Sequence, residues 1–198
     1  MFDPKKSPLY KAKRDKPALI EVPELQFLMV EGVGNPNDST DFMNAIQALY
    51  GLVYTLKFTL KTETPPRLFS IGPLEGLWWA DDMSAFKMEQ REDWRWNAML
   101  WVPEFVTQDD MDSAREQLVK KGKTVVDNVR LEKFTEGLCA QVMHIGPYAD
   151  EAPTIEALHA FIEESGHSLR GKHHEIYLGD PRRAAPEKLR TIIRQPVG

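Results

Sequence analysis

Two residues one position apart, Glu175 and Tyr177, are the best candidates for proton chemistry in this chain. Residues 174–178 have the composition of a strand, and alternate residues of a strand share one face. Burying a carboxylate is costly, and its desolvation would raise the pKa of Glu175 enough to make it a proton donor or acceptor near neutral pH. A buried Glu175 would also attract a cationic aromatic ligand. An edge strand that leaves Glu175 in water is the other interpretation, and the residues alone keep it open.

A cluster of tryptophans suggests a ligand-binding wall to accompany these two residues. The chain has 5 Trp among 198 residues, and all five lie between positions 78 and 101. In a strand over 93–102 two tryptophans share a face, whereas the adjacent Trp78 and Trp79 point to opposite faces, so only one of them joins a given pocket. A flat apolar wall of this kind suits a planar polycyclic ligand. These tryptophans could instead form a core, but five overfill a small domain and their N–H groups need partners. The predicted ligand-binding residues are Trp79, Trp96, Tyr54, Tyr50, Trp78 and Trp94.

Other chemistry is poorly supported. His144, His173 and His174 lack the i, i+4 spacing of a helical metal site, and the adjacent pair diverges on a strand, so we predict no metal. The Gly32-Val33-Gly34 segment lacks the third glycine of a phosphate loop, so we predict no nucleotide and no other cofactor. Cys139 lies among apolar residues and reads as a buried, unreactive thiol in a strand.

Composition narrows the function class. The net charge is −5, hydrophobic residues make up 42% and charged residues 28% of the chain, which excludes a disordered or collagen-like chain. A pI of about 5.6 argues against a nucleic-acid partner, because phosphate neutralisation needs an excess of Lys and Arg. No secretory signal and no stretch long enough to span a membrane is recognisable. We therefore expect a cytoplasmic protein with a small-molecule partner. The sequence leaves the oligomeric state open.

Hydrophobic periodicity predicts the elements that hold these residues. A long helix is expected over 40–61, a second between the cap Thr107 and Gly122, and a third after Asp150 that stops at Gly166. The expected strands are 19–22, 26–30, 68–80, 93–102, 125–129, 138–145, 174–178 and 189–194, with a mixed segment at 131–136.

The order of these elements contains a repeat, because a β–α–β–β unit occurs twice. Two such units packed about a pseudo-twofold axis would give one α+β domain with a ligand cleft where they meet. We expect a single domain over 1–198, with a lead-in at 1–16, repeat one at about 17–105 and repeat two at about 125–197. A chance similarity of two strand–loop–helix units is the alternative.

Several motifs in this order resemble the GyrI-like small-molecule-binding family, in its stand-alone branch. The resemblance covers nearly the whole chain. No DNA-binding segment is visible before residue 17, so the regulators that carry this domain as an effector-binding module, as in BmrR-type multidrug sensors, are a poorer match. The motifs are Glu75-Gly76-Leu77-Trp78-Trp79-Ala80, Trp94-Arg95-Trp96, Pro103-Glu104-Phe105-Val106, Glu136-Gly137-Leu138-Cys139, His144-Ile145-Gly146-Pro147-Tyr148, residues 173–178, Asp180-Pro181-Arg182-Arg183 and Pro186-Glu187-Lys188-Leu189-Arg190-Thr191.

The resemblance implies a duplicated fold in which Glu175 faces the ligand in the cleft. Similar stand-alone members hydrolyse cyclopropanoid, DNA-alkylating natural products of the CC-1065 and yatakemycin type. Transferred to this chain, Trp79 and Trp96 would stack on the planar substrate and Glu175 would orient or deprotonate the attacking water. Ring opening leaves a phenolate-like oxygen that a tyrosine hydroxyl would stabilise, and Tyr148 and Tyr177 are the candidates.

Three functions therefore remain open. They are a detoxifying hydrolase, a non-catalytic binder that sequesters planar drugs or cations, and an interaction protein like the family's gyrase-inhibitor namesake. The catalytic assignment, if the first holds, is Glu175, Tyr148 and Tyr177.

Overall fold

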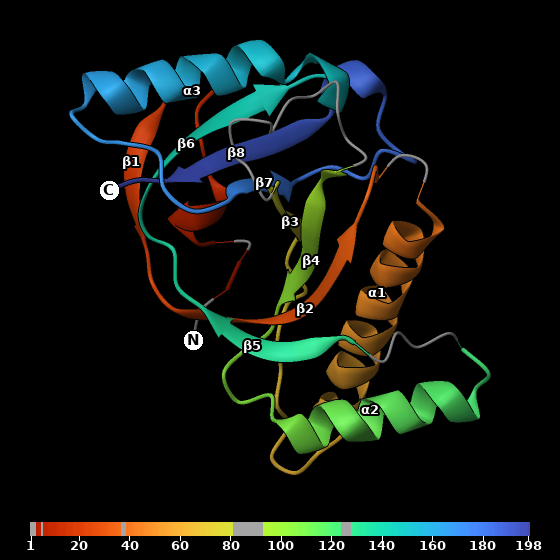
Figure 1. Ribbon diagram of the computed structural model, residues 1–198. Helices are drawn as coiled ribbons and strands as arrows, with labels where there is room; N and C mark the ends of the chain where they lie inside the picture. The colour runs from red at the N-terminus through yellow and green to blue at the C-terminus, as the bar shows by residue number, and fades with distance from the viewer. Residues whose placement is uncertain (1–2, 5, 37–38, 81–92, 124–127) are drawn as a thin grey trace.

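Eight strands form one curled sheet in the computed structural model of this chain, and all neighbouring strands are antiparallel (Figure 1). The structure describes residues 3–4, 6–36, 39–80, 93–123 and 128–198. The strand order is β1-β6-β8-β7-β3-β4-β2-β5. The strands and α-helices in chain order are β1 (Ala18–Val22), β2 (Leu25–Val33), α1 (Thr40–Lys61), β3 (Leu74–Trp79), β4 (Arg95–Trp101), α2 (Gln108–Lys120), β5 (Arg130–Phe134), β6 (Gly137–Ile145), α3 (Ala152–Glu164), β7 (His173–Tyr177) and β8 (Arg190–Pro196). Short 3₁₀ turns occur at Pro8–Tyr10, Tyr148–Asp150 and Pro186–Lys188.

The strand order confirms the duplicated β–α–β–β architecture. Strands β2, β3 and β4 with helix α1 correspond to β6, β7 and β8 with helix α3, and the pseudo-twofold axis passes between β7 and β3. The outermost strands are exchanged between the halves. Strand β1 precedes the first unit but pairs with β6 of the second, and β5 precedes the second unit but pairs with β2 of the first. This exchange ties the two units into one sheet.

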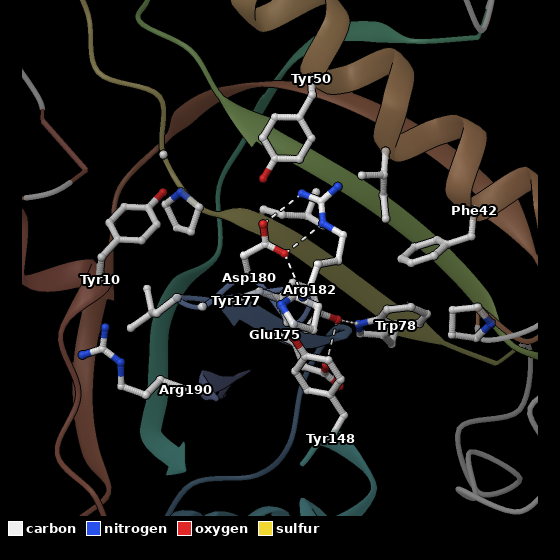
Figure 2. A pocket seen from close by; sticks show the side chains of 18 of the residues that line it. Tyr10, Phe42, Tyr50, Trp78, Tyr148, Glu175, Tyr177, Asp180, Arg182 and Arg190 are labelled. Atoms are coloured by element: carbon white, nitrogen blue, oxygen red, sulfur yellow. Dashed lines mark hydrogen bonds and ion pairs between the residues drawn. The ribbon is translucent and has the colours of Figure 1, made fainter. Parts of the chain in front are cut away.

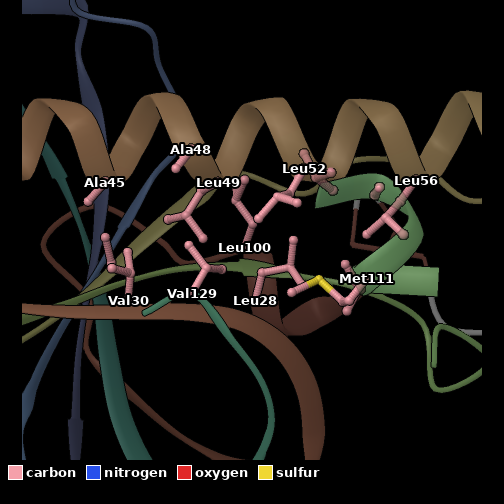
Figure 3. Close-up of a cluster of buried hydrophobic side chains, with 14 of the residues drawn as sticks. Leu28, Val30, Ala45, Ala48, Leu49, Leu52, Leu56, Leu100, Met111 and Val129 are labelled. Atoms are coloured by element: carbon pink, nitrogen blue, oxygen red, sulfur yellow. The ribbon is translucent and has the colours of Figure 1, made fainter. Parts of the chain in front are cut away.

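Helix α1 supplies most of the core of the first unit. Ser39 caps its N-terminus by accepting a hydrogen bond from the Phe42 amide (3.1 Å). One face of the helix packs on the sheet, and α2 packs against it from the side (Figure 3). Helix α3 covers the second unit in the equivalent way through Leu158 and Ile162. The residues of the larger core that Figure 3 labels are Leu28, Val30, Ala45, Ala48, Leu49, Leu52, Leu56, Leu100, Met111 and Val129.

The predicted elements agree with the structure except at two strands. The strand expected over 68–80 begins only at Leu74, since Pro73 has no backbone N–H to give to a sheet ladder. The strand expected at 125–129 falls mostly outside the described residues, and the observed strand is β5, in the segment read as mixed. No helix in the described part of the chain is both long and apolar enough to cross a bilayer.

The face of the sheet opposite the helices carries a chain of buried, hydrogen-bonded polar side chains. The Tyr10 hydroxyl donates to Glu75 Oε1 (2.6 Å), and Glu75 Oε2 lies 3.0 Å from His174 Nε2. His174 Nδ1 lies 2.9 Å from Glu136 Oε1, and Arg194 Nη1 donates to Glu136 Oε2 (3.0 Å). Burial lowers the pKa of His174, but the two carboxylates outweigh burial and raise it. The chain therefore pairs two acids with two cations.

This polar chain also fastens the N-terminal segment, which lies inside the curl of the sheet (Figure 1). Arg194 Nη2 donates to the carbonyl of Leu9 (2.6 Å), and Gln141 Nε2 donates to the carbonyl of Lys11 (3.1 Å). The segment is thereby held at one end of the cavity described next.

Candidate functional site

A cavity of about 890 Å³ opens between helix α1, the central strands and the loops that follow β6 and β7 (Figure 2). Its size is within the range of small-molecule sites. Tyr10 and Lys11 of the N-terminal segment form one end, and the Asp180–Arg182 ion pair (2.9 Å) stands at its edge. Seven of the residues that line it are aromatic. These aromatic residues are Tyr10, Phe42, Tyr50, Trp78, Trp94, Tyr148 and Tyr177.

Glu175 lines the cavity from the centre of the sheet, because β7 lies between β8 and β3. Its side chain is 14% exposed. The Tyr177 hydroxyl donates to Glu175 Oε2 (2.8 Å) and accepts from Trp78 Nε1 (3.2 Å), so three side chains are linked (Figure 2). The edge-strand interpretation is therefore wrong: the carboxylate is largely buried and faces a pocket.

Trp78 forms the aromatic wall beside Glu175, and a glycine lets it do so. Gly76 pairs with Glu175 in the register of β3 and β7, and a Cβ on Gly76 would lie 2.8 Å from Trp78 Nε1. The indole therefore folds across a position that must lack a side chain. Phe42 (ring centroids 5.6 Å apart) and Trp94 (5.9 Å) extend the wall around Trp78.

Three of the predicted ligand-binding residues do not line the cavity. Trp79 points to the other face of β3, where the Lys172 ammonium lies 3.3 Å from the centroid of its ring. Trp96 is buried in the core beneath the wall, in edge contact with Phe42 (4.9 Å). Tyr54 is 48% exposed and stacks outside on Tyr50 (6.3 Å). The other three predicted ligand-binding residues, Trp78, Trp94 and Tyr50, do line the cavity.

Tyr148 enters the cavity opposite Tyr177, in an edge-to-face contact with ring centroids 5.5 Å apart. Burial, followed by the charges of Glu151 and Glu175, raises the pKa of Tyr148 to about 12. Burial and the same two carboxylates also hold the pKa of Tyr177 well above its usual value. Both phenols therefore stay protonated at neutral pH. Tyr177 gives its proton to Glu175, whereas the Tyr148 hydroxyl has no hydrogen-bond partner among the residues that the structure describes.

Two residues of the site were not predicted from the sequence. Glu151 precedes α3, lines the cavity and is 2% exposed. His173 is buried on the same face as Glu175, with its Nε2 3.3 Å from Glu175 Oε1. Glu151 follows a turn and reads as an ordinary surface acid. His173 shares its face with Glu175 by simple alternation, so that periodicity could have identified it. No cluster of three or more His, Cys, Asp or Glu side chains arranged to hold a metal occurs in the described ranges.

The sequence matches the model of a known domain family over most of its length. The family model of the GyrI-like small molecule binding domain matches residues 15–197. This chain belongs to the GyrI-like family. The assignment accounts for the duplicated fold and makes the cavity the expected small-molecule site. No curated protein matches the chain.

Several solved structures are similar to this chain. An uncharacterized conserved protein from Listeria innocua is 40% identical, with 98% of each chain covered and a TM-score of 0.90. A hydrolase from Listeria innocua is also 40% identical over 98% of each chain, with a TM-score of 0.85. The C-terminal domain of EcmrR is 17% identical, covers 92% of this chain and 97% of its own, and has a TM-score of 0.64, which shows a shared fold alone.

Proposed function

We propose that this GyrI-like protein binds a planar, polycyclic aromatic molecule in its cavity and hydrolyses a strained cyclopropane ring in that molecule. The observation that carries the proposal is the largely buried Glu175 carboxylate, hydrogen-bonded by Tyr177 beside the Trp78 wall. A flat aromatic ligand stacked on Trp78 would expose a reactive carbon to a water held by Glu175. The similarity to a protein described as a hydrolase, at 40% identity, supports a hydrolytic reaction.

The chemistry of such a step fits the side chains present. Water attacks a ring carbon conjugated to a dienone, the new C–O bond forms, and the ring C–C bond breaks toward the carbonyl. Glu175 takes the proton of the attacking water. The electron pair ends on a phenolate oxygen. The Tyr148 hydroxyl, which donates to no other described residue of the site, stabilises this oxygen by donating a hydrogen bond to it. Protonation of that oxygen completes the addition of one water molecule.

The test is direct observation of ring opening. The protein is incubated with a cyclopropanoid alkylator of the CC-1065 type, and the hydrated product is followed by mass spectrometry, with the buffer alone as control. We expect product in large molar excess over protein. Product that never exceeds background hydrolysis would refute the hydrolase function.

A non-catalytic binder of aromatic cations is the second candidate, and the second carboxylate favours it. Glu151 adds a further negative charge to the cavity lining at 2% exposure. Quenching of tryptophan fluorescence by a planar cation, without turnover of any cyclopropanoid compound, would support the binder and exclude the hydrolase.

A further inference from the structure

The loop that brings Tyr148 and Glu151 to the cavity folds over a buried histidine. His144 lies near the end of β6, is 6% exposed and does not itself line the cavity. By the alternation of the strand it shares the helix-covered face of β6 with Ala140 and Val142, which pack under α3. The imidazole therefore lies between the sheet and the start of α3.

Both nitrogens of the His144 ring have hydrogen-bond partners. Nε2 lies 3.2 Å from the carbonyl oxygen of Pro147, and Nδ1 lies 2.9 Å from Thr154 Oγ1. A carbonyl oxygen can only accept, so Nε2 carries the hydrogen, and Nδ1 of the neutral ring accepts from the Thr154 hydroxyl. The imidazole thus joins the beginning of the loop to the first turn of α3.

The two cavity residues of this loop lie between these two attachment points. Tyr148 directly follows Pro147, whose carbonyl also accepts the Asp150 amide (3.0 Å) and so closes the 3₁₀ turn that holds Tyr148. Glu151 follows that turn, and its carbonyl accepts the Thr154 amide (2.9 Å). Segment 147–154 is therefore a closed unit in which one imidazole connects the two ends.

A glycine allows the ring to reach the loop. Gly146 has a φ of 145°, and a Cβ on it would lie 3.3 Å from His144 Nε2. A side chain at this position would therefore be strained and would press on the imidazole. The Gly146 amide donates to the carbonyl of Leu189 (3.1 Å), which fixes the start of the loop to the sheet.

The duplicated fold shows that this histidine is not needed to build a β–α–β–β unit. Gly32 of β2 is the equivalent of His144, since each lies two residues before a glycine of positive φ. Gly32 pairs with Trp96 in the sheet, and the Trp96 indole occupies the space that a Cβ on Gly32 would need. His144 pairs with the much smaller Thr191. The imidazole is thus special to the unit whose loop carries Tyr148.

We propose that His144 is a positioning residue, which fixes segment 147–154 and so aims the Tyr148 hydroxyl at the oxygen where negative charge develops during ring opening. This inference rests on the proposed function. His144 does not line the cavity, so its effect reaches the reaction only through Tyr148. Trp78 and Glu175 lie on β3 and β7, outside segment 147–154, so ligand stacking and activation of water do not depend on the imidazole.

A double-mutant cycle tests this dependence on Tyr148. Hydrolysis of a cyclopropanoid compound is measured in the wild type, His144→Leu, Tyr148→Phe and the double variant. We expect His144→Leu to lower kcat at least about tenfold with little change in KM. In the Tyr148→Phe background the same substitution should lower kcat less than about twofold, because the hydroxyl to be aimed is already absent. Equal reductions in both backgrounds would overturn the proposal.

Two conservative variants separate the hydrogen bonds from the shape of the side chain. His144→Gln supplies an amide donor for the Pro147 carbonyl and an amide oxygen for the Thr154 hydroxyl, so it should stay within about threefold of the wild-type kcat. Thr154→Val keeps the shape but removes the hydroxyl, and it should lower kcat about threefold. A His144→Gln protein as slow as His144→Leu would overturn the proposal.

Hydrogen exchange measures the same attachment without substrate. In His144→Leu the amides of Asp150 and Glu151 should exchange at least about tenfold faster than in the wild type. Leu52→Ala is the control, because it weakens the buried core under α1 without touching segment 147–154. It should leave the exchange of these two amides and the value of kcat unchanged. Unaltered exchange of both amides in His144→Leu would overturn the proposal.

The two proposals fail in different ways. If the wild-type protein hydrolyses no cyclopropanoid compound, the proposed function fails, and hydrogen exchange alone decides whether His144 holds segment 147–154. If the wild type turns over and the double-mutant cycle is additive, the positioning role of His144 fails and the hydrolase stands.

Discussion

Replacing Glu136 by Gln should strongly destabilise the fold, and the size of the effect follows from the buried polar chain. The Glu136 side chain is 2% exposed and contacts His174 and Arg194 at 2.9 and 3.0 Å. Burial raises its pKa, but the charges and hydrogen bonds of those two partners outweigh burial and hold it at about 2, against an ordinary 4.5. That difference corresponds to about 3 kcal/mol of unfolding free energy at neutral pH. Removing one partner of a buried ion pair costs roughly 3–5 kcal/mol of unfolding free energy, a range that includes the value obtained from the pKa difference.

The pH dependence has a definite sign. Because the folded pKa of Glu136 is depressed, its contribution is fully present above pH 4.5 and is lost as the pH falls toward 2. Glu136→Gln should therefore lower Tm by roughly 6–12 °C at pH 7, and the gap to wild type should narrow on acidification below pH 4.5.

Urea unfolding at pH 7 and at pH 3 measures both effects. Glu132→Gln is the control, because Glu132 lies on β5, shortly before Glu136 in the chain, and forms a surface ion pair with Arg130 at 41% exposure. This substitution should cost less than about 1 kcal/mol. A Glu136→Gln protein within about 1 kcal/mol of wild type at pH 7, or a gap that does not depend on pH, would refute the reasoning.

Three further outcomes test the site. Trp78→Ala should weaken binding of a planar aromatic ligand at least about tenfold in fluorescence titrations, while Trp79→Ala, on the other face of the sheet, should leave the affinity unchanged; equal losses would contradict the assignment. Tyr148→Phe should reduce kcat about a hundredfold in the product assay with little change in ligand affinity; an unaltered kcat would exclude Tyr148 as the hydrogen-bond donor. The Cys139 thiol, with a pKa raised to about 12 mainly by burial, should react with thiol reagents only after unfolding; rapid labelling of the native protein would be inconsistent with its position.

Much of the fold could be predicted because its helices and strands show strong periodicity. Helix α1 begins and ends where the apolar stripe predicts, and the β–α–β–β repeat is visible as two similar successions of elements. The exchange of β1 and β5 between the halves could not be predicted, because both strands are short and their pairing partners lie far away in the sequence. Sequence periodicity shows which face of a strand is apolar, but it does not show which other strand pairs with it.

The acidic residue of the candidate site, Glu175, could be predicted from the sequence. The tryptophans that line the cavity beside it could be predicted only in part. Alternation placed Glu175 and Tyr177 together, and both line the cavity. The choice between Trp78 and Trp79 required the register of β3, in which Gly76 makes room for one indole only on the helix side. The glycine two residues before Trp78 was the available signal. Glu151 could not be predicted, because its burial depends on how the loop after β6 folds over the cavity.

The most direct test of the central claim compares binding and turnover in one variant, Glu175→Gln. Its amide keeps the size of the side chain but cannot accept the proton of the attacking water. We predict that it binds the cyclopropanoid compound with an affinity near that of wild type, by tryptophan quenching, and forms product at no more than about one hundredth of the wild-type rate. Product formation at the wild-type rate with normal binding would contradict the account.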